Sequence, residues 1–84
     1  MTKPPISDAA RIFGERVRAR RQELGLSQEQ IAEGSQMHWS YFGQVERGRR
    51  NLTLHSMLRL AAVLGVDAGE LVRGLPVPAK PDRD

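Results

Sequence analysis

Apolar residues recur at helical spacing through most of this chain, and no stretch alternates apolar and polar residues as a strand does. The clearest pattern lies in the middle, where Tyr41, Phe42 and Val45 share one face of a helix predicted from about His38 to Glu46. The opposite face of this helix should point outward. The residues predicted to lie on that outward face are Trp39, Ser40, Gly43 and Gln44.

A second short helix is predicted directly before this one. Ser27 is followed three residues later by Gln30, which is the spacing of a capping box, so the helix should run from about Gln28 to Gly34. Residues 34–36 favour a turn over a longer helix, and Met37 should tuck that turn against the core. Two short helices around a tight turn are the arrangement with which a small protein places one helix in the major groove of DNA.

A longer helix is predicted before this pair. Ser7 or Asp8 can cap its start, and Gly25 suits the left-handed position that closes a helix. The spacing of the residues between them predicts an inward face. The residues on that face are Phe13, Val17, Arg21 and Leu24.

Two further helices are predicted after the pair. Thr53 can cap the first of them, and Gly65 can close it. Asp67 and Glu70 have capping-box spacing and open a short last helix that ends at Gly74. The apolar residues expected to face inward from the first of these helices are Leu54, Met57, Leu58, Ala61 and Leu64. The chain as a whole therefore predicts an all-α fold of five helices.

Length and composition limit the chain to one small domain. With 84 residues and 39% hydrophobic content there is room for a single core, which we place in residues 8–74. Proline and charge dominate residues 1–7 and 75–84, so we expect a disordered amino-terminal arm and a disordered carboxy-terminal tail. The chain has no cysteine, no apolar run of membrane-spanning length and no signal-peptide core, and these features favour a cytoplasmic protein.

The net charge of +3 is modest, but the basic residues are concentrated in two places. Five arginines and one glutamate lie between Arg11 and Arg21, and Arg47, Arg49 and Arg50 follow the predicted third helix. Arginine suits phosphate and guanine recognition, although a GC-rich genome would produce the same excess of arginine without any function. The charges alone therefore leave a nucleic-acid partner open.

The segment LSQEQIAEGSQMHWSYFGQVERGRRN, residues 26–51, resembles the helix-turn-helix of the Cro/C1 repressor family, also called the XRE family. The resemblance spans roughly residues 13 to 72. It implies a lambda-repressor-like DNA-binding domain and a sequence-specific transcriptional regulator. It also implies a buried ion pair between Arg21 and Glu46, and it places Gln44 at a base-reading position.

Three residues depart from the family pattern. Gln36 stands where glycine is usual in the turn, His38 stands where serine or threonine usually caps the recognition helix, and Trp39 stands where a polar base reader is common.

Each candidate contact has a functional and a structural interpretation. Gln28 could reach a phosphate from the first turn of its helix or be a plain surface residue. Trp39 could pack on a thymine methyl group, or lie over its own domain or against a partner. Gly43 could allow close approach of the backbone to DNA, or reflect drift. Gln44 could pair bidentately with adenine, and the Tyr41 hydroxyl could reach a phosphate.

Arg49, Arg50 and Asn51 are expected to contact phosphates, because their loop leaves the recognition helix beside the DNA backbone. The alternative is a solvated basic loop. His38 and His55 have no carboxylate or cysteine companions at ligand spacing, so we predict no metal and no cofactor.

The sequence shows no enzyme motif: it has no Walker-type loop, no nucleophile elbow and no paired acids in an environment that would separate their pKa values. We expect a homodimer on palindromic double-stranded DNA, joined through the last helix and the segment before it by Val66, Leu71 and Val72. The competing interpretation is a helical adaptor that docks on the transcription machinery without reading DNA.

Overall fold

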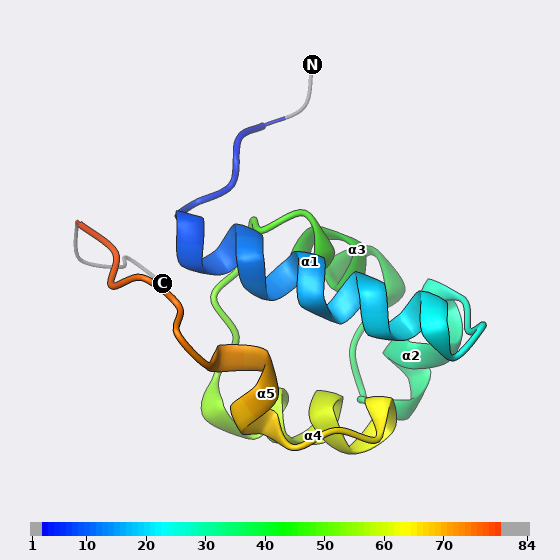
Figure 1. The fold of residues 1–84 in the computed structure, drawn as a ribbon. Helices are drawn as coiled ribbons and strands as arrows, with labels where there is room; N and C mark the ends of the chain where they lie inside the picture. Colours follow the sequence, from blue (N-terminus) through cyan, green and yellow to red (C-terminus); the bar gives the residue numbers. More distant parts are fainter. Residues whose placement is uncertain (1–2, 80–84) are drawn as a thin grey trace.

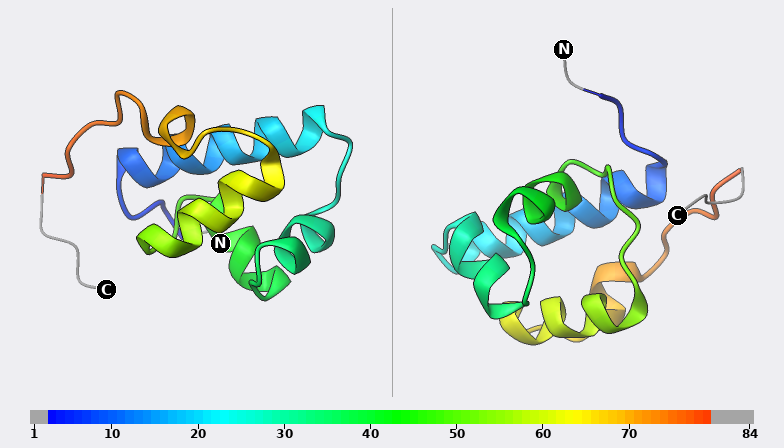
Figure 2. Two further views of the ribbon diagram at one scale, coloured as in Figure 1. Left: turned by 90° about the horizontal axis from the view of Figure 1, so that it is seen from below. Right: turned by 180° about the vertical axis from the view of Figure 1, so that it is seen from behind.

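The computed structural model describes residues 3–79, and these residues form five helices and no strand. The predicted all-α fold is therefore confirmed. The helices are α1 (Asp8–Glu23), α2 (Gln28–Gly34), α3 (Trp39–Glu46), α4 (Leu54–Leu64) and α5 (Ala68–Val72). In the view of Figure 1, α1 crosses the molecule with α3 packed behind it and α4 and α5 below it. The two further views in Figure 2 show α2 and α3 side by side at one end.

The helix ends lie close to their predicted positions because local side chains cap them. Ser27 and Gln30 form the complete capping box at α2, and Asp67 and Glu70 form one at α5. The side chain of Thr53 accepts a hydrogen bond from the amide of Ser56 at α4. Such caps satisfy amides that a helix leaves without partners, so short-range sequence sets where each helix begins.

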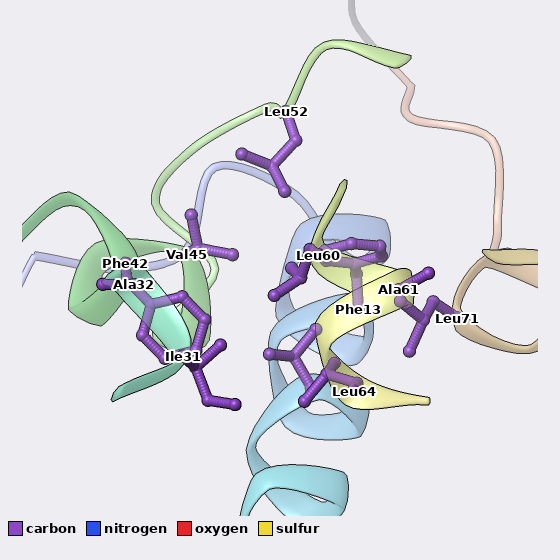
Figure 3. Packing of buried hydrophobic residues seen from close by; sticks show 11 residues of the cluster. Phe13, Ile31, Ala32, Phe42, Val45, Leu52, Leu60, Ala61, Leu64 and Leu71 are labelled. Carbon is purple, nitrogen blue, oxygen red and sulfur yellow. The ribbon is translucent and has the colours of Figure 1, made fainter. Parts of the chain in front are cut away.

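The core is one apolar cluster to which all five helices and the loop after α3 contribute (Figure 3). Its buried members are Phe13, Val17, Ile31, Ala32, Phe42, Val45, Leu52, Leu60, Ala61, Leu64 and Leu71. Met37 packs against this cluster from the turn between α2 and α3, as predicted. The cluster holds α3 by its inner face, so the outer face stays available.

Three leucines predicted to face inward are instead exposed. Leu24, the C-cap residue of α1, is 38% exposed. Leu54 and Leu58, one turn apart on α4, are 62% and 49% exposed. Their neighbours Met57 and Ala61 pack in or against the core. The inward face that helical spacing predicts for α4 is therefore wider than the face that the core covers.

Two glycines bring α1 against the end of α3 and the loop that follows it. A Cβ atom at Gly14 would lie 2.5 Å from the backbone oxygens of Val45 and Glu46. Gly48 has a φ of +76°, and a Cβ atom there would lie 2.8 Å from the Cα of Arg11. Any larger residue at Gly14 would push the two helices apart, so this contact fixes where the loop after α3 emerges.

Parts of both predicted tails are described and contact the helices. The amide of Ile6 donates a hydrogen bond to the carbonyl of Gly48 (2.8 Å), Ser7 caps α1, and Leu75 packs partly against the core. Residues 1–2 and 80–84 of the expected arm and tail lie outside the described residues. The boundaries of the domain stay a prediction. None of the helices in residues 3–79 combines the length and apolar character needed to cross a membrane.

Candidate nucleic-acid interface

A buried ion pair ties α3 to α1. Arg21 Nε lies 2.6 Å from Glu46 Oε2, and Arg21 Nη2 lies 3.1 Å from Glu46 Oε1, so the structure brings the two predicted partners together. The two side chains are 14% and 3% exposed. Arg21 also donates to the carbonyl of Leu26 (3.0 Å). The paired charges are thus hydrogen-bonded at both ends, which is the condition for burying them.

Gln28 joins this network from α2. Its Nε2 donates a hydrogen bond to Glu46 Oε1 (2.9 Å), and its side chain is partly buried. One carboxylate therefore accepts hydrogen bonds from α1 and α2 while it belongs to α3. The three helices are held in one relative orientation, and the exposed side of α3 is fixed with respect to the rest of the molecule.

The turn between α2 and α3 contains two of the departures from the family pattern. Gln36 adopts a left-handed backbone with a φ of 61°, the conformation that glycine takes most easily. His38 caps α3, because its Nδ1 accepts a hydrogen bond from the amide of Ser40 (3.1 Å). A ring nitrogen thus does what a serine or threonine oxygen would do.

Gly43, predicted to face outward, is buried beneath two polar side chains. A Cβ atom at this position would lie 3.5 Å from Arg47 Nη1 and 3.7 Å from Gln28 Oε1. Two long side chains therefore fold over the glycine and fill the space that its missing side chain leaves. Arg47 is not among the site residues predicted from sequence, and only its place in the basic run pointed to it.

Trp39 and Ser40 form the open front of α3. The Trp39 side chain is 55% exposed and lies beside the His38 ring, with ring centroids 6.0 Å apart and planes inclined by 26°. Ser40 is also exposed, and its hydroxyl lies 2.8 Å from His38 Nδ1. The indole therefore extends α3 outward and does not cover the core.

Gln44, Arg50 and Tyr41 form a cluster at the other end of this surface. Arg50 Nε donates a hydrogen bond to Gln44 Oε1 (2.6 Å), and the Arg50 guanidinium lies over the Tyr41 ring at 5.3 Å from its centroid. Gln44 and Tyr41 are partly buried, and Arg50 is exposed. The sequence placed all three residues near DNA, but it did not predict that they contact one another.

The loop after α3 carries the remaining cations. Arg49 Nε donates a hydrogen bond to the carbonyl of Lys3 (3.3 Å), which brings the amino-terminal segment beside the loop, and Asn51 is exposed. Lys3 thus lies near the basic loop, and helical spacing in the sequence could not predict this proximity. Among residues 3–79, no three His, Cys, Asp or Glu side chains gather to hold a metal ion.

Comparison with known proteins also indicates a helix-turn-helix domain. The family model described as a helix-turn-helix domain matches residues 12–75. Control protein C.SmaI of Serratia marcescens is 43% identical over 65 residues, which cover 77% of each protein. The crystal structure of the restriction-modification controller protein C.AhdI from Aeromonas hydrophila superposes with a TM-score of 0.72 at 45% identity, over 74% of this chain and 94% of that one.

A structure containing DNA is also similar. The master regulator for biofilm formation SinR, solved in complex with DNA, superposes with a TM-score of 0.67 at 30% identity, over 70% of this chain and 95% of that one.

Proposed function

This chain belongs to the helix-turn-helix family of Cro/C1 type, and from that premise we propose that it binds double-stranded DNA in a sequence-specific manner and regulates transcription. One observation carries the proposal. The network of Arg21, Glu46 and Gln28 fixes the orientation of α3, so that its outer face is turned away from the core. The basic loop at residues 47–51 lies directly beside this face. An α-helix fits the major groove, and the loop then lies beside the phosphates.

The contacts divide into two kinds. Trp39, Ser40 and Gln44 face the bases, with the Trp39 ring placed to touch a thymine methyl group. Arg49, Arg50 and Asn51 approach the backbone from the loop, together with Tyr41 at the helix edge. Gly43 has no side chain, so Arg47 and Gln28 can lie close over α3 at this position.

Gln28 is proposed to hold a phosphate while it holds Glu46. An amide nitrogen carries two hydrogens, and Glu46 Oε1 takes one of them. The other can donate to a phosphate oxygen beside the first turn of α2. This contact would link the position of the DNA backbone directly to the ion pair that orients α3.

We also propose that the protein acts as a homodimer on a palindromic site, because a single α3 offers only a few base contacts. The residues expected to join the two copies differ in what they offer. Leu71 is only 3% exposed and belongs to the core, and Val66 packs partly against the core. Val72 is 41% exposed, and the exposed Leu54 and Leu58 of α4 add apolar surface.

The alternative of a helical adaptor has one observation in its favour, the exposed Trp39 ring, since aromatic residues are enriched in protein interfaces. An adaptor, however, has no need of a basic loop beside its outward helix. A regulator of transcription works where the DNA is, which supports a cytoplasmic location, and the proposal involves no cofactor.

Selection of bound sequences from random duplex DNA tests the proposed function. We expect the purified protein to enrich one motif with two related half-sites about one helical turn apart, as a symmetric pair of recognition helices requires. A pool that is retained in a salt-dependent way but shows no enriched motif would show charge-driven binding only. That result would contradict sequence-specific regulation.

A further inference from the structure

The contact between Gln44 and Arg50 restricts which base this end of α3 can read. Arg50 Nε lies 2.6 Å from Gln44 Oε1, and the same guanidinium lies over the Tyr41 ring. We infer that Gln44 and Arg50 act as one unit, the Gln44–Arg50 pair, whose target in the major groove is guanine, so that Arg50 contacts a base in place of the phosphate contact proposed for it above. The inference rests on the proposed function and names the base that this part of the interface recognises.

The Gln44 amide is held in one orientation. A guanidinium has five N–H donors and no acceptor, so only the oxygen of the amide can face Arg50. Gln44 Oε1 therefore points toward the arginine, and Nε2 points away from it. The arginine thus removes the freedom that a glutamine side chain normally has to present either its donor or its acceptor.

The atoms that the pair leaves open are all donors. Within residues 3–79, the hydrogen bond to Gln44 is the only one in which the Arg50 side chain takes part, and it uses Nε alone. The Nη atoms and Gln44 Nε2 remain, and all of them are donors. The pair therefore offers hydrogen-bond donors and a positive charge, while its one acceptor, Gln44 Oε1, is turned toward the guanidinium.

The two purines answer this donor pattern differently. Guanine presents two acceptors in the major groove, N7 and O6, whereas adenine presents the acceptor N7 and the donor N6. A free glutamine pairs with adenine because its oxygen accepts from N6. Here that oxygen faces Arg50, so the adenine amino group would meet other donors. Guanine suits the pair at both positions, and this replaces the adenine pairing expected for an isolated Gln44.

Two contacts hold the pair in place before DNA arrives. The guanidinium lies 5.3 Å from the centroid of the Tyr41 ring, within the range of a cation–π interaction. The backbone amide of Arg49 donates to the carbonyl of Gln44 (2.9 Å), which ties the loop to the end of α3. Side chains ordered in advance lose less freedom on binding, so the geometry favours a real preference for one base.

Binding to selected duplexes tests the inference. The base pair read by Gln44 is located as the one whose preference Gln44→Ala relaxes, and guanine at that pair is then exchanged for adenine. We expect the exchange to weaken the wild type about 5- to 150-fold, the range for one good bidentate contact. Arg50→Ala should lose the same preference at the same pair. The double variant should lose no more than either single variant.

The matched control is Arg49→Ala, which removes a neighbouring loop arginine and should keep the guanine preference while weakening all duplexes alike. Replacing the guanine by 7-deazaguanine removes the N7 acceptor. This should weaken the wild type and leave Gln44→Ala and Arg50→Ala nearly unaffected. Tyr41→Phe should keep the guanine preference because the ring stays, whereas Tyr41→Ala should reduce it.

The outcomes separate this inference from the function on which it rests. Adenine at the pair read by Gln44, or a guanine preference that survives Arg50→Ala, would overturn the Gln44–Arg50 pair and leave sequence-specific binding intact. The same holds if Gln44→Ala relaxes the preference at no base pair. Failure to enrich any motif would overturn the proposed function and the inference together.

Discussion

Gln36 holds the turn between α2 and α3 in a backbone conformation that favours glycine. Its φ of 61° brings the Cβ atom close to the neighbouring backbone, a cost of about 1 kcal/mol for most residues. The side chain is exposed and lies at the only non-glycine position with positive φ in residues 3–79. The strain is local to this residue, so a substitution should reveal it directly.

We predict that Gln36→Gly raises the free energy of unfolding by about 1 kcal/mol, because glycine adopts this φ without a steric cost. The control is Gln22→Gly in α1, where the backbone is helical and the same substitution should lower stability by roughly 0.5 to 1 kcal/mol. Urea unfolding measures both changes as shifts of the midpoint. Midpoints that move in the same direction would show that Gln36 carries no strain.

The Arg21–Glu46 pair joins α1 to α3, and the loss of one partner would leave the other as a buried charge without compensation. A domain of 84 residues has roughly 4 to 13 kcal/mol in total. Glu46→Ala leaves Arg21 buried without its partner, and such a loss typically costs about 3 to 5 kcal/mol. We predict a far larger fall in the thermal unfolding midpoint for Glu46→Ala than for Glu29→Ala on the exposed side of α2. Similar midpoints for the two variants would mean that the pair contributes little.

At the level of elements, α3 and the loop after it should have separable effects on binding. Arg49 lies in the loop as a cation, and Trp39 lies on the front of α3 as a neutral ring. Phosphate contacts release counterions and add to the salt dependence of binding, whereas contacts with base edges do not.

We therefore predict that Arg49→Ala weakens binding to all duplexes alike. The fall of log K with log salt should become less steep by about one unit. Trp39→Ala should leave the slope unchanged and relax the preference at one base position. Fluorescence anisotropy over a salt series measures both quantities. An unchanged slope in Arg49→Ala would remove that residue from the phosphate contacts.

The helix positions could be predicted from sequence because their signals are local. Ser27, Thr53 and Asp67 each satisfy amides within three residues, and Gly65 takes the left-handed position that ends α4. Which side chains of a helix face the core was less predictable, since it depends on which distant element packs against that helix. Leu54 and Leu58 follow the helical period of α4, but the core stops short of them.

The candidate site divides in the same way. The exposure of Trp39 follows from helical spacing, whereas the burial of Gly43 depends on Arg47 and Gln28 folding over it. The contact of Arg50 with Gln44 joins residues six positions apart across the end of a helix. Rules of helical spacing do not cover such a contact, because its geometry is set by the loop.

At the level of the whole molecule, the unpaired apolar surface bears on the proposed dimer. Val72 is 41% exposed on α5, and Leu54 and Leu58 are exposed on α4. When a second copy covers apolar side chains that were in contact with water, the free energy of the system falls. A symmetric pair would also present two copies of α3 to the same side of a duplex.

We predict that the wild type at micromolar concentration scatters light as a particle of about twice its 9.4 kDa chain mass. Val72→Glu should remain folded, shift toward the monomer and lose affinity for the selected duplex, because it places a charge in the interface. Val77→Glu is the control, since Val77 is 90% exposed and should leave the mass unchanged. A wild type that is monomeric both free and on DNA would contradict the dimer.

The most direct test of the central claim is the ratio of two affinities measured at one salt concentration. The first is for the duplex obtained by selection, and the second is for a duplex of the same composition in scrambled order. If α3 reads bases in the major groove, the selected duplex should bind at least about 1,000-fold more tightly at physiological salt. Equal affinities for the two duplexes would show that the protein binds DNA only through its charge, and would contradict the recognition of bases by α3.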